Sequence, residues 1–143
     1  MINLHTDERL DVEYCRGGCY EPAALDRINT LLRDFRTGEV HPIDPALMDH
    51  LFDAAHALGV EPRFSVISGY RSPATNARLH EHSPGVASHS LHIEGRAIDV
   101  RLARVDCASL ASRAREMQRG GVGYYRASDF VHLDTGRFRV WKG

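Results

Sequence analysis

Apolar residues recur every three or four positions in several stretches of the chain, which is the spacing of an amphipathic helix. The first stretch begins at Pro22, and its apolar positions are Leu25, Ile28, Leu32 and Phe35. The second begins at Asp44 and Pro45, a favoured N-cap followed by a residue suited to the first helical position. Its apolar positions are Leu47, Leu51, Ala54 and Leu58. Gly59 then follows as a typical helix-ending residue, so we expect a helix at each stretch.

Two further helices are predicted in the second half of the chain. Ser72-Pro73 begins a short one that extends to His80. Asp106 is the N-cap of a longer one, with apolar positions at Leu110, Ala114 and Met117. We expect Gly120-Gly121 to end this last helix.

Alternation of apolar and polar residues predicts a strand over Arg96–Leu102. One face of this strand carries Ile98, Val100 and Leu102. The other face carries Ala97, Asp99 and Arg101, so Asp99 points away from the apolar side.

Shorter runs predict further strands over residues 63–68, 122–125, 130–133 and 138–141. Residues 2–14 alternate loosely and predict a strand or hairpin that ends at a glycine turn. Residues 81–95 show no period, which predicts a loop. Helices and strands are mixed without regular βαβ alternation, so we expect a single α+β domain over residues 1–143.

The composition is that of a globular domain. The chain has 143 residues, of which 43% are hydrophobic and 26% charged, enough to bury a core. Eighteen basic and nineteen acidic residues give a formal net charge of −1, so no basic excess indicates a nucleic-acid partner. The apolar runs are far shorter than a membrane span, and no signal peptide is visible at the N-terminus.

The three cysteines do not predict a thiolate metal site, because no C-x-x-C pair is present. Cys15 and Cys19 bracket a glycine turn, and a disulfide between them would have to meet demanding geometry. Cys107 stands at the start of a predicted helix.

Three side chains have the types and the placement of a metal site. His92 lies in the predicted loop, and Asp99 lies on the polar face of the strand that follows it. His132 lies in another predicted strand between apolar neighbours. Catalytic zinc sites have three protein ligands and one open position. The spacing alone leaves two interpretations open: a zinc site, or a solvated carboxylate and a histidine satisfied within the core.

The segment Ser90-x-His92-x-x-Gly95-x-Ala97-x-Asp99 resembles the S-x-H-x-x-G-x-A-x-D signature of the D-Ala-D-Ala-type zinc peptidases. That group includes lysostaphin-type enzymes and the zinc domain of hedgehog signalling proteins. The upstream segment Ser68-Gly69-Tyr70-Arg71 resembles the S-G-[YF]-R segment of the group. The run from Phe130 to Gly136, the ending at Trp141 and the stretches 3–6 and 38–44 are similar to the murein endopeptidase K branch. The resemblance covers essentially the whole chain.

The resemblance implies a small α+β domain whose central antiparallel sheet carries one Zn²⁺, with His92, Asp99 and His132 as ligands. It also implies a zinc metallopeptidase that hydrolyses the stem peptides of peptidoglycan, as an endopeptidase or a carboxypeptidase. The bond that it cuts stays open between D-Ala to diaminopimelate, diaminopimelate to diaminopimelate, and a terminal D-Ala. We expect a periplasmic or cell-wall-associated monomer with no nucleic-acid partner and no membrane span.

A zinc peptidase also needs a carboxylate that takes a proton from the attacking water. In a straight strand Asp134 shares a face with His132, whereas Asp129 would need a bend in the chain to reach the metal. Members of the group place this base three residues before the last histidine ligand, which favours Asp129. Asp134 would then accept the second N–H of a ligand histidine.

Further candidates lie near the signature. The planar fork of Arg71 suits a developing oxyanion or a substrate carboxylate, and the alternative is a surface arginine. Ser90 would orient the substrate or stabilise its loop, and Tyr70 would line the site or belong to the core.

Two rival functions remain from the sequence. One is an inactive domain that binds cell-wall peptide or a protein partner without cutting it, and the other is a purely structural metal. Arg71 and the carboxylates beside His132 favour an enzyme, because a structural site needs no open position.

Overall fold

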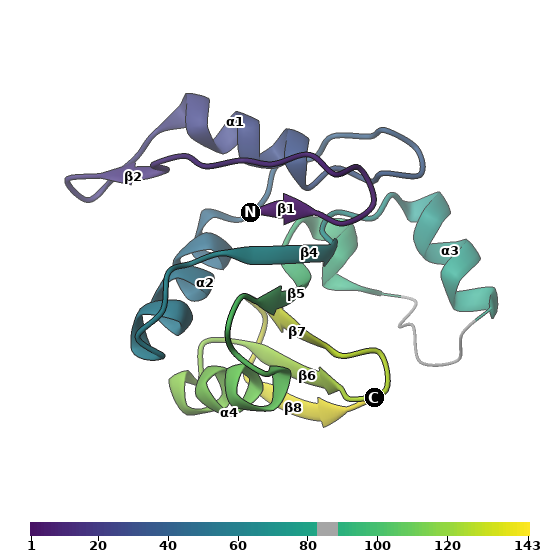
Figure 1. Cartoon of the computed structure of the whole chain (residues 1–143). Helices are drawn as coiled ribbons and strands as arrows, with labels where there is room; N and C mark the ends of the chain where they lie inside the picture. Colours follow the sequence, from purple (N-terminus) through teal and green to yellow (C-terminus); the bar gives the residue numbers. More distant parts are fainter. Residues whose placement is uncertain (83–88) are drawn as a thin grey trace.

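The computed structural model is organised around a mixed sheet of six strands, in the order β1-β4-β5-β7-β6-β8 (Figure 1). The structure describes residues 1–82 and 89–143. The four central strands are antiparallel, whereas the edge strands β1 and β8 run parallel to their neighbours β4 and β6. This architecture confirms the predicted α+β class and its central antiparallel sheet.

The strands of the sheet are β1 (Ile2–Asn3), β4 (Phe64–Ser68), β5 (Ala97–Leu102), β6 (Gly121–Tyr125), β7 (Phe130–Asp134) and β8 (Arg139–Lys142). A separate hairpin consists of β2 (Cys15–Arg16) and β3 (Cys19–Tyr20). The helices are α1 (Pro22–Leu31), α2 (Pro45–Ala57), α3 (Pro73–His82) and α4 (Cys107–Met117), with a short 3₁₀-helix η1 (Leu91–Glu94). The strands predicted after residue 60 are therefore confirmed to within one or two residues.

The predicted N-cap residues are found at the starts of α2 and α4. The Asp44 carboxylate accepts a hydrogen bond from Ala46 N at 3.0 Å, and Asp106 accepts one from Ser109 N at 2.8 Å. The predicted glycine end of α4 is wrong. Gln118, with a φ of 53°, ends this helix before Gly120 is reached.

The strand or hairpin predicted over residues 2–14 is confirmed only in part. Ile2–Asn3 joins the sheet, and the chain then turns back on itself, with a φ of 58° at Asp7 and an antiparallel bridge between Arg9 and Ile2. A single long strand is wrong. The hairpin begins at Cys15, where its register pairs Cys15 with Tyr20 rather than with Cys19. Both cysteines, like Cys107, are free thiols.

The predicted loop over residues 81–95 needs two corrections. Helix α3 continues to His82, and residues 91–94 form the 3₁₀-helix η1. The part of this prediction that falls on residues 83–88 lies outside the described residues.

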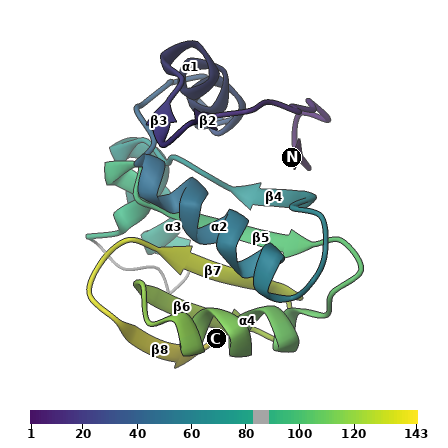
Figure 2. The ribbon, with the colours of Figure 1, turned by 90° about the vertical axis from the view of Figure 1, so that its left-hand side faces the viewer.

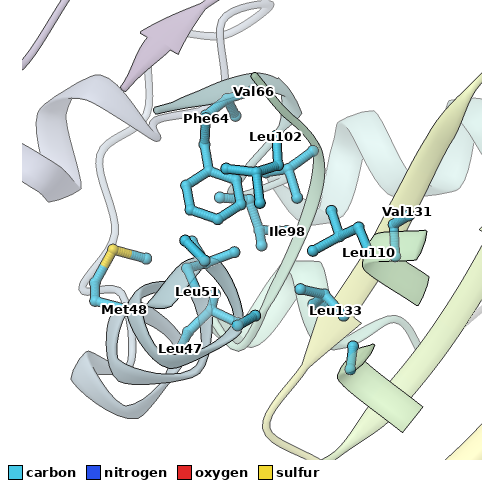
Figure 3. Close-up of a cluster of buried hydrophobic side chains, with 14 of the residues drawn as sticks. Leu47, Met48, Leu51, Phe64, Val66, Ile98, Leu102, Leu110, Val131 and Leu133 are labelled. Atoms are coloured by element: carbon cyan, nitrogen blue, oxygen red, sulfur yellow. The ribbon is translucent and has the colours of Figure 1, made fainter. Parts of the chain in front are cut away.

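Helices α2 and α4 cover one face of the sheet, and α3 lies on the opposite side (Figure 2). The core forms between α2, α4 and the apolar face of β5 and β7 (Figure 3). Leu51, Leu110, Ile98 and Leu133 are at most 1% exposed there. Burial of such side chains is the main driving force of the fold. Because side chains alternate along a strand, Asp99 and His132 face away from this core. None of the helices in the described ranges is both long and apolar enough to span a membrane.

Candidate metal centre

One row of residues crosses the sheet on the face that α2 and α4 leave uncovered. The strand registers align Asp99 with His132, His132 with Gly123 and Gly123 with Trp141. Alternation therefore directs the Asp99 and His132 side chains to the same side. The sheet thus brings together two candidate ligands that are far apart in the sequence.

His92 is brought to the same point by η1 rather than by the sheet. The Ser90 hydroxyl accepts a hydrogen bond from His92 N at 3.3 Å, and the His92 carbonyl accepts one from Arg71 N at 3.1 Å. Gly95 ends η1 with a φ of 67°, and a Cβ at this position would collide with the carbonyl of Pro42. The glycine of the signature is therefore needed both for its conformation and for close packing.

The donor atoms of the three residues converge. His132 Nδ1 lies 2.9 Å from Asp99 Oδ1, His92 Nε2 lies 3.4 Å from the same oxygen, and the two nitrogens are 3.2 Å apart. All three side chains are buried. Within the described residues, His92, Asp99 and His132 thus form a group that could hold a metal ion, and they are the three residues that the resemblance implies as ligands.

In each imidazole one nitrogen, here called the inner nitrogen, faces the other candidate ligands. The other, outer nitrogen lies next to a hydrogen-bond acceptor. His92 Nδ1 lies 2.7 Å from the carbonyl of Gly69, and His132 Nε2 lies 2.9 Å from Asp134 Oδ2. When these nitrogens carry the protons, both inner nitrogens present lone pairs at 3.2 Å from each other. A cation between them removes that repulsion, so the donor set fits a metal held by two neutral imidazoles and one carboxylate.

Burial and the neighbouring charges shift the pKa values of all three candidate ligands. Burial lowers the pKa of His92. Burial also opposes the ionised form of Asp99, but His92 and the hydrogen bond to His132 outweigh it and hold the pKa of Asp99 well below its usual range. For His132 the burial is outweighed by hydrogen bonds to Asp134 and Asp99, which raise its pKa. The carboxylate of Asp99 is therefore ionised and ready to bind a cation.

Arg71 is bound directly to this carboxylate. Its Nη2 donates to Asp99 Oδ2 at 2.7 Å, and its Nε donates to Ser68 Oγ at 2.9 Å. The arginine leaves Asp99 Oδ1 to face the two histidines. Arg71 is not a solvated surface residue, since only 14% of its side chain is exposed.

Asp134 is completely buried behind His132. Its Oδ1 accepts hydrogen bonds from Gly121 N and Gly136 N, and its Oδ2 lies against His132 Nε2. Both oxygens also accept from Arg139, at 3.0 and 2.7 Å. These contacts hold the pKa of Asp134 well below its usual range although burial opposes this. Its position is the one expected for a carboxylate that orients a ligand histidine.

Asp129 lies at the bend that enters β7. It has a φ of 52°, and its carbonyl and carboxylate both lie near Arg101 Nε, at 2.5 and 3.6 Å. Its side chain is 70% exposed. Burial, followed by the nearby Asp129 carboxylate, raises the pKa of the Cys107 thiol to about 11. The chain therefore bends at Asp129, and the Asp129 carboxylate lies beside Arg101. That this carboxylate reaches the metal stays a prediction.

The remaining candidates have structural contacts. Tyr70 is 7% exposed, belongs to the hydrophobic core and stacks on His41 with ring centroids 4.7 Å apart. Ser90 caps η1.

Two residues at the site do not appear among the candidates from the sequence. Arg139 binds Asp134, and the Trp141 ring lies 5.1 Å from the His132 ring. The alternation of glycines at 121 and 123 against Arg139 and Trp141 is a sequence signal for their contacts, but it requires knowing that β6 pairs with β8.

Comparisons with known proteins agree on one family. A family model described as "Peptidoglycan L,D-endopeptidase MepK" matches residues 1–141. A protein of Haemophilus influenzae named "Probable peptidoglycan L,D-endopeptidase MepK" is 44% identical over 142 residues, which are 99% of this chain and 76% of that protein. The "Peptidoglycan L,D-endopeptidase MepK" of Escherichia coli K12 is 40% identical over 141 residues, which are 99% of this chain and 78% of that protein.

Proposed function

Because the chain belongs to the peptidoglycan L,D-endopeptidase MepK family, we propose that it is a zinc-dependent peptidase that cuts stem-peptide cross-links of peptidoglycan. Family membership confirms the resemblance seen in the signature and, with it, the expectation of a peptidoglycan peptidase. The observation that carries the proposal is the convergence of His92 Nε2, His132 Nδ1 and Asp99 Oδ1.

We assign zinc as the metal and these three residues as its protein ligands. Two imidazoles and one carboxylate form a common donor set of catalytic zinc sites, which leave a fourth position open. When bound there, zinc supplies a Lewis acid that polarises the scissile carbonyl and makes water a stronger nucleophile. The hydrogen bonds from His92 to Gly69 O and from His132 to Asp134 support this assignment, because each fixes which nitrogen faces the metal.

The proton transfer is assigned to Asp129. A general base needs a lone pair that is not already used, and Asp134 is surrounded by donors and has no exposed surface. Asp129 is exposed on a bend next to β7, three residues before His132. Its carboxylate would take a proton from water and deliver it to the leaving amine, after moving away from Arg101 when substrate binds.

Arg71 is assigned to the substrate carbonyl or a substrate carboxylate. Its Nε and Nη2 are held by Ser68 and Asp99, and this fixes the plane of the guanidinium. We propose that Nη1 makes the contact with substrate, because a planar fork held at two of its nitrogens is oriented before the substrate arrives.

The substrate bond follows from chirality. The relatives are named as L,D-endopeptidases, which cut an internal bond between an L and a D centre. Among the three bonds that the sequence left open, only diaminopimelate to diaminopimelate is both internal and of this kind. Peptidoglycan is the partner under this proposal, and the site of action is the periplasm or cell wall.

Digestion of purified cross-linked muropeptides tests the proposal. We compare three samples: the metal-free wild type, the zinc-reloaded wild type and a zinc-reloaded Asp99→Ala variant. Each is incubated with muropeptides cross-linked either from D-Ala to diaminopimelate or from diaminopimelate to diaminopimelate. We expect only the zinc-reloaded wild type to cleave, and only the diaminopimelate to diaminopimelate cross-link. Binding without cleavage would favour the rival function of an inactive peptide-binding domain, and equal cleavage after exhaustive chelation would contradict a zinc enzyme.

A further inference from the structure

Two glycines leave β6 without side chains on the face that carries the site. Gly121 pairs with Arg139 of β8, and Gly123 pairs with Trp141 of β8 and with His132 of β7. A Cβ at Gly121 would collide with the Asp134 carboxylate and the Arg139 guanidinium, and a Cβ at Gly123 would collide with the Trp141 indole. Side chains of the edge strand β8 therefore lie across β6 and reach the residues of β7.

The guanidinium of Arg139 holds both oxygens of Asp134. Nη1 donates to Oδ1 at 3.0 Å and Nη2 donates to Oδ2 at 2.7 Å, a two-point contact that fixes the plane of the carboxylate. Oδ2 is also the atom that lies 2.9 Å from His132 Nε2. The carboxylate is completely buried, so Arg139 is the cation that compensates its charge directly.

Trp141 restricts the arginine from its other side. The Arg139 guanidinium lies 5.0 Å from the centre of the Trp141 ring, and Trp141 Nε1 donates to the hydroxyl of Tyr125 at 3.1 Å. The same indole lies 5.1 Å from the His132 ring. A guanidinium that contacts both an aromatic ring and a carboxylate has little freedom to rotate.

We propose that Arg139 is a positioning residue of the metal centre. Acting through Asp134, it keeps the proton of the neutral His132 ring on Nε2, so that Nδ1 presents its lone pair to the metal. This role rests on the proposed metal centre, but it does not depend on which peptide bond is cut. Without the arginine, Asp134 remains near His132 but loses the two-point contact that aligns Oδ2 with the imidazole.

The test is zinc affinity in the Arg139→Gln variant of the full chain. Competition with a chelator of known affinity gives the zinc dissociation constant, which we expect to rise about 10- to 100-fold. In the zinc-loaded protein, the His132 Nε2–H proton is followed by NMR, and its exchange with water should become faster. Arg139→Lys keeps the charge but not the fork, so it should give an intermediate affinity.

Arg113→Gln is the matched control. It removes an arginine ion pair with Glu116 on α4, away from the ligands. Wild-type zinc affinity and a protected Nε2–H signal in Arg139→Gln would overturn the proposal, even if that variant were less stable. If Arg139→Gln does not fold, Arg139→Lys decides by the same two measurements.

The outcome is separate from that of the proposed function. Weakened zinc binding in Arg139→Gln would support the positioning role even if the wild-type protein cut no muropeptide. Cleavage by the wild type together with unchanged zinc affinity in the variant would support the function and overturn the role of Arg139.

Discussion

His132 contacts Asp134 through Nε2 and Asp99 through Nδ1, at 2.9 Å in both cases. The two carboxylates lie on opposite sides of one imidazole, and only Asp99 lies next to His92 as well. The ring can direct one lone pair at a metal, and Asp134 occupies the other side as an acceptor. This relationship distinguishes the carboxylate that we assign as a ligand from the one that orients a ligand.

The first prediction concerns the metal content. His132→Ala removes one of three ligands, and a three-ligand site has no spare donor, so zinc affinity should collapse. Metal analysis after dialysis should find about one zinc per chain in the wild type and close to none in the variant. His56→Ala, on the exposed side of α2, is the control and should keep its zinc. Full zinc occupancy in His132→Ala would refute the ligand assignment.

A second prediction separates the two carboxylates that flank His132. Asp129→Asn should keep its zinc and lose turnover by at least about 100-fold, because the amide cannot accept a proton. Asp134→Asn should instead weaken zinc binding, because an amide accepts less strongly from His132 Nε2 and loses the charge pair with Arg139. Zinc content and muropeptide cleavage are measured for both. An active Asp129→Asn protein would reverse the assignment of the base.

Arg71 gives the third prediction. Arg71→Ala should retain zinc, since the three ligands remain, and should lose on the order of 100-fold in kcat, the scale for removing a donor to the developing oxyanion. Arg71→Lys should recover only part of this, because an ammonium cannot bind Ser68 and Asp99 with the same planar fork. Steady-state kinetics on cross-linked muropeptides provide the check. An unchanged kcat in Arg71→Ala would show that the arginine does not act on the substrate and only contacts Asp99.

The sequence predicted those parts of the site that local pattern determines. Alternation over Arg96–Leu102 places Asp99 opposite the apolar face, and β5 has this arrangement. Gly95 between His92 and Asp99 does turn the chain, with a φ of 67°. The bend at Asp129 was also anticipated, although its contact with Arg101 depends on the tertiary structure.

The parts that were missed depend on pairing between distant strands. Arg139 and Trp141 alternate on β8, but their contact with β7 requires the parallel pairing of β8 with β6 and two glycines between them. At the N-terminus, Leu10, Val12 and Tyr14 alternate as in a strand. They are half-buried against the core, and the turn at Asp7 keeps all but Ile2–Asn3 out of a strand of the sheet. An alternation of apolar and polar residues indicates that every second side chain is buried. An extended segment that packs on the core without joining a sheet shows the same alternation as a strand.

The last prediction concerns stability at acid pH and rests on His50 of α2. Its side chain is 1% exposed, and neither ring nitrogen has a hydrogen-bond partner among the described residues. Burial, followed by the charge of Arg119, lowers the pKa of His50 from 6.5 to about 4. Between these two values the unfolded chain binds a proton that the folded protein does not. The free energy of unfolding should therefore fall as the pH drops through this range, by about 3 kcal/mol from this group.

Urea denaturation of the metal-free protein at pH 8, 6, 5 and 4 measures this effect against His50→Leu. Leucine binds no proton. The free energy of unfolding of the His50→Leu variant, relative to that of the wild type, should therefore increase as the pH falls from about 6.5 towards 4. The comparison of the two proteins cancels the contributions of all the other ionisable groups. His56→Leu, on the exposed side of the same helix, should lose stability in parallel with the wild type. If His50→Leu does so as well, His50 is not held neutral by burial.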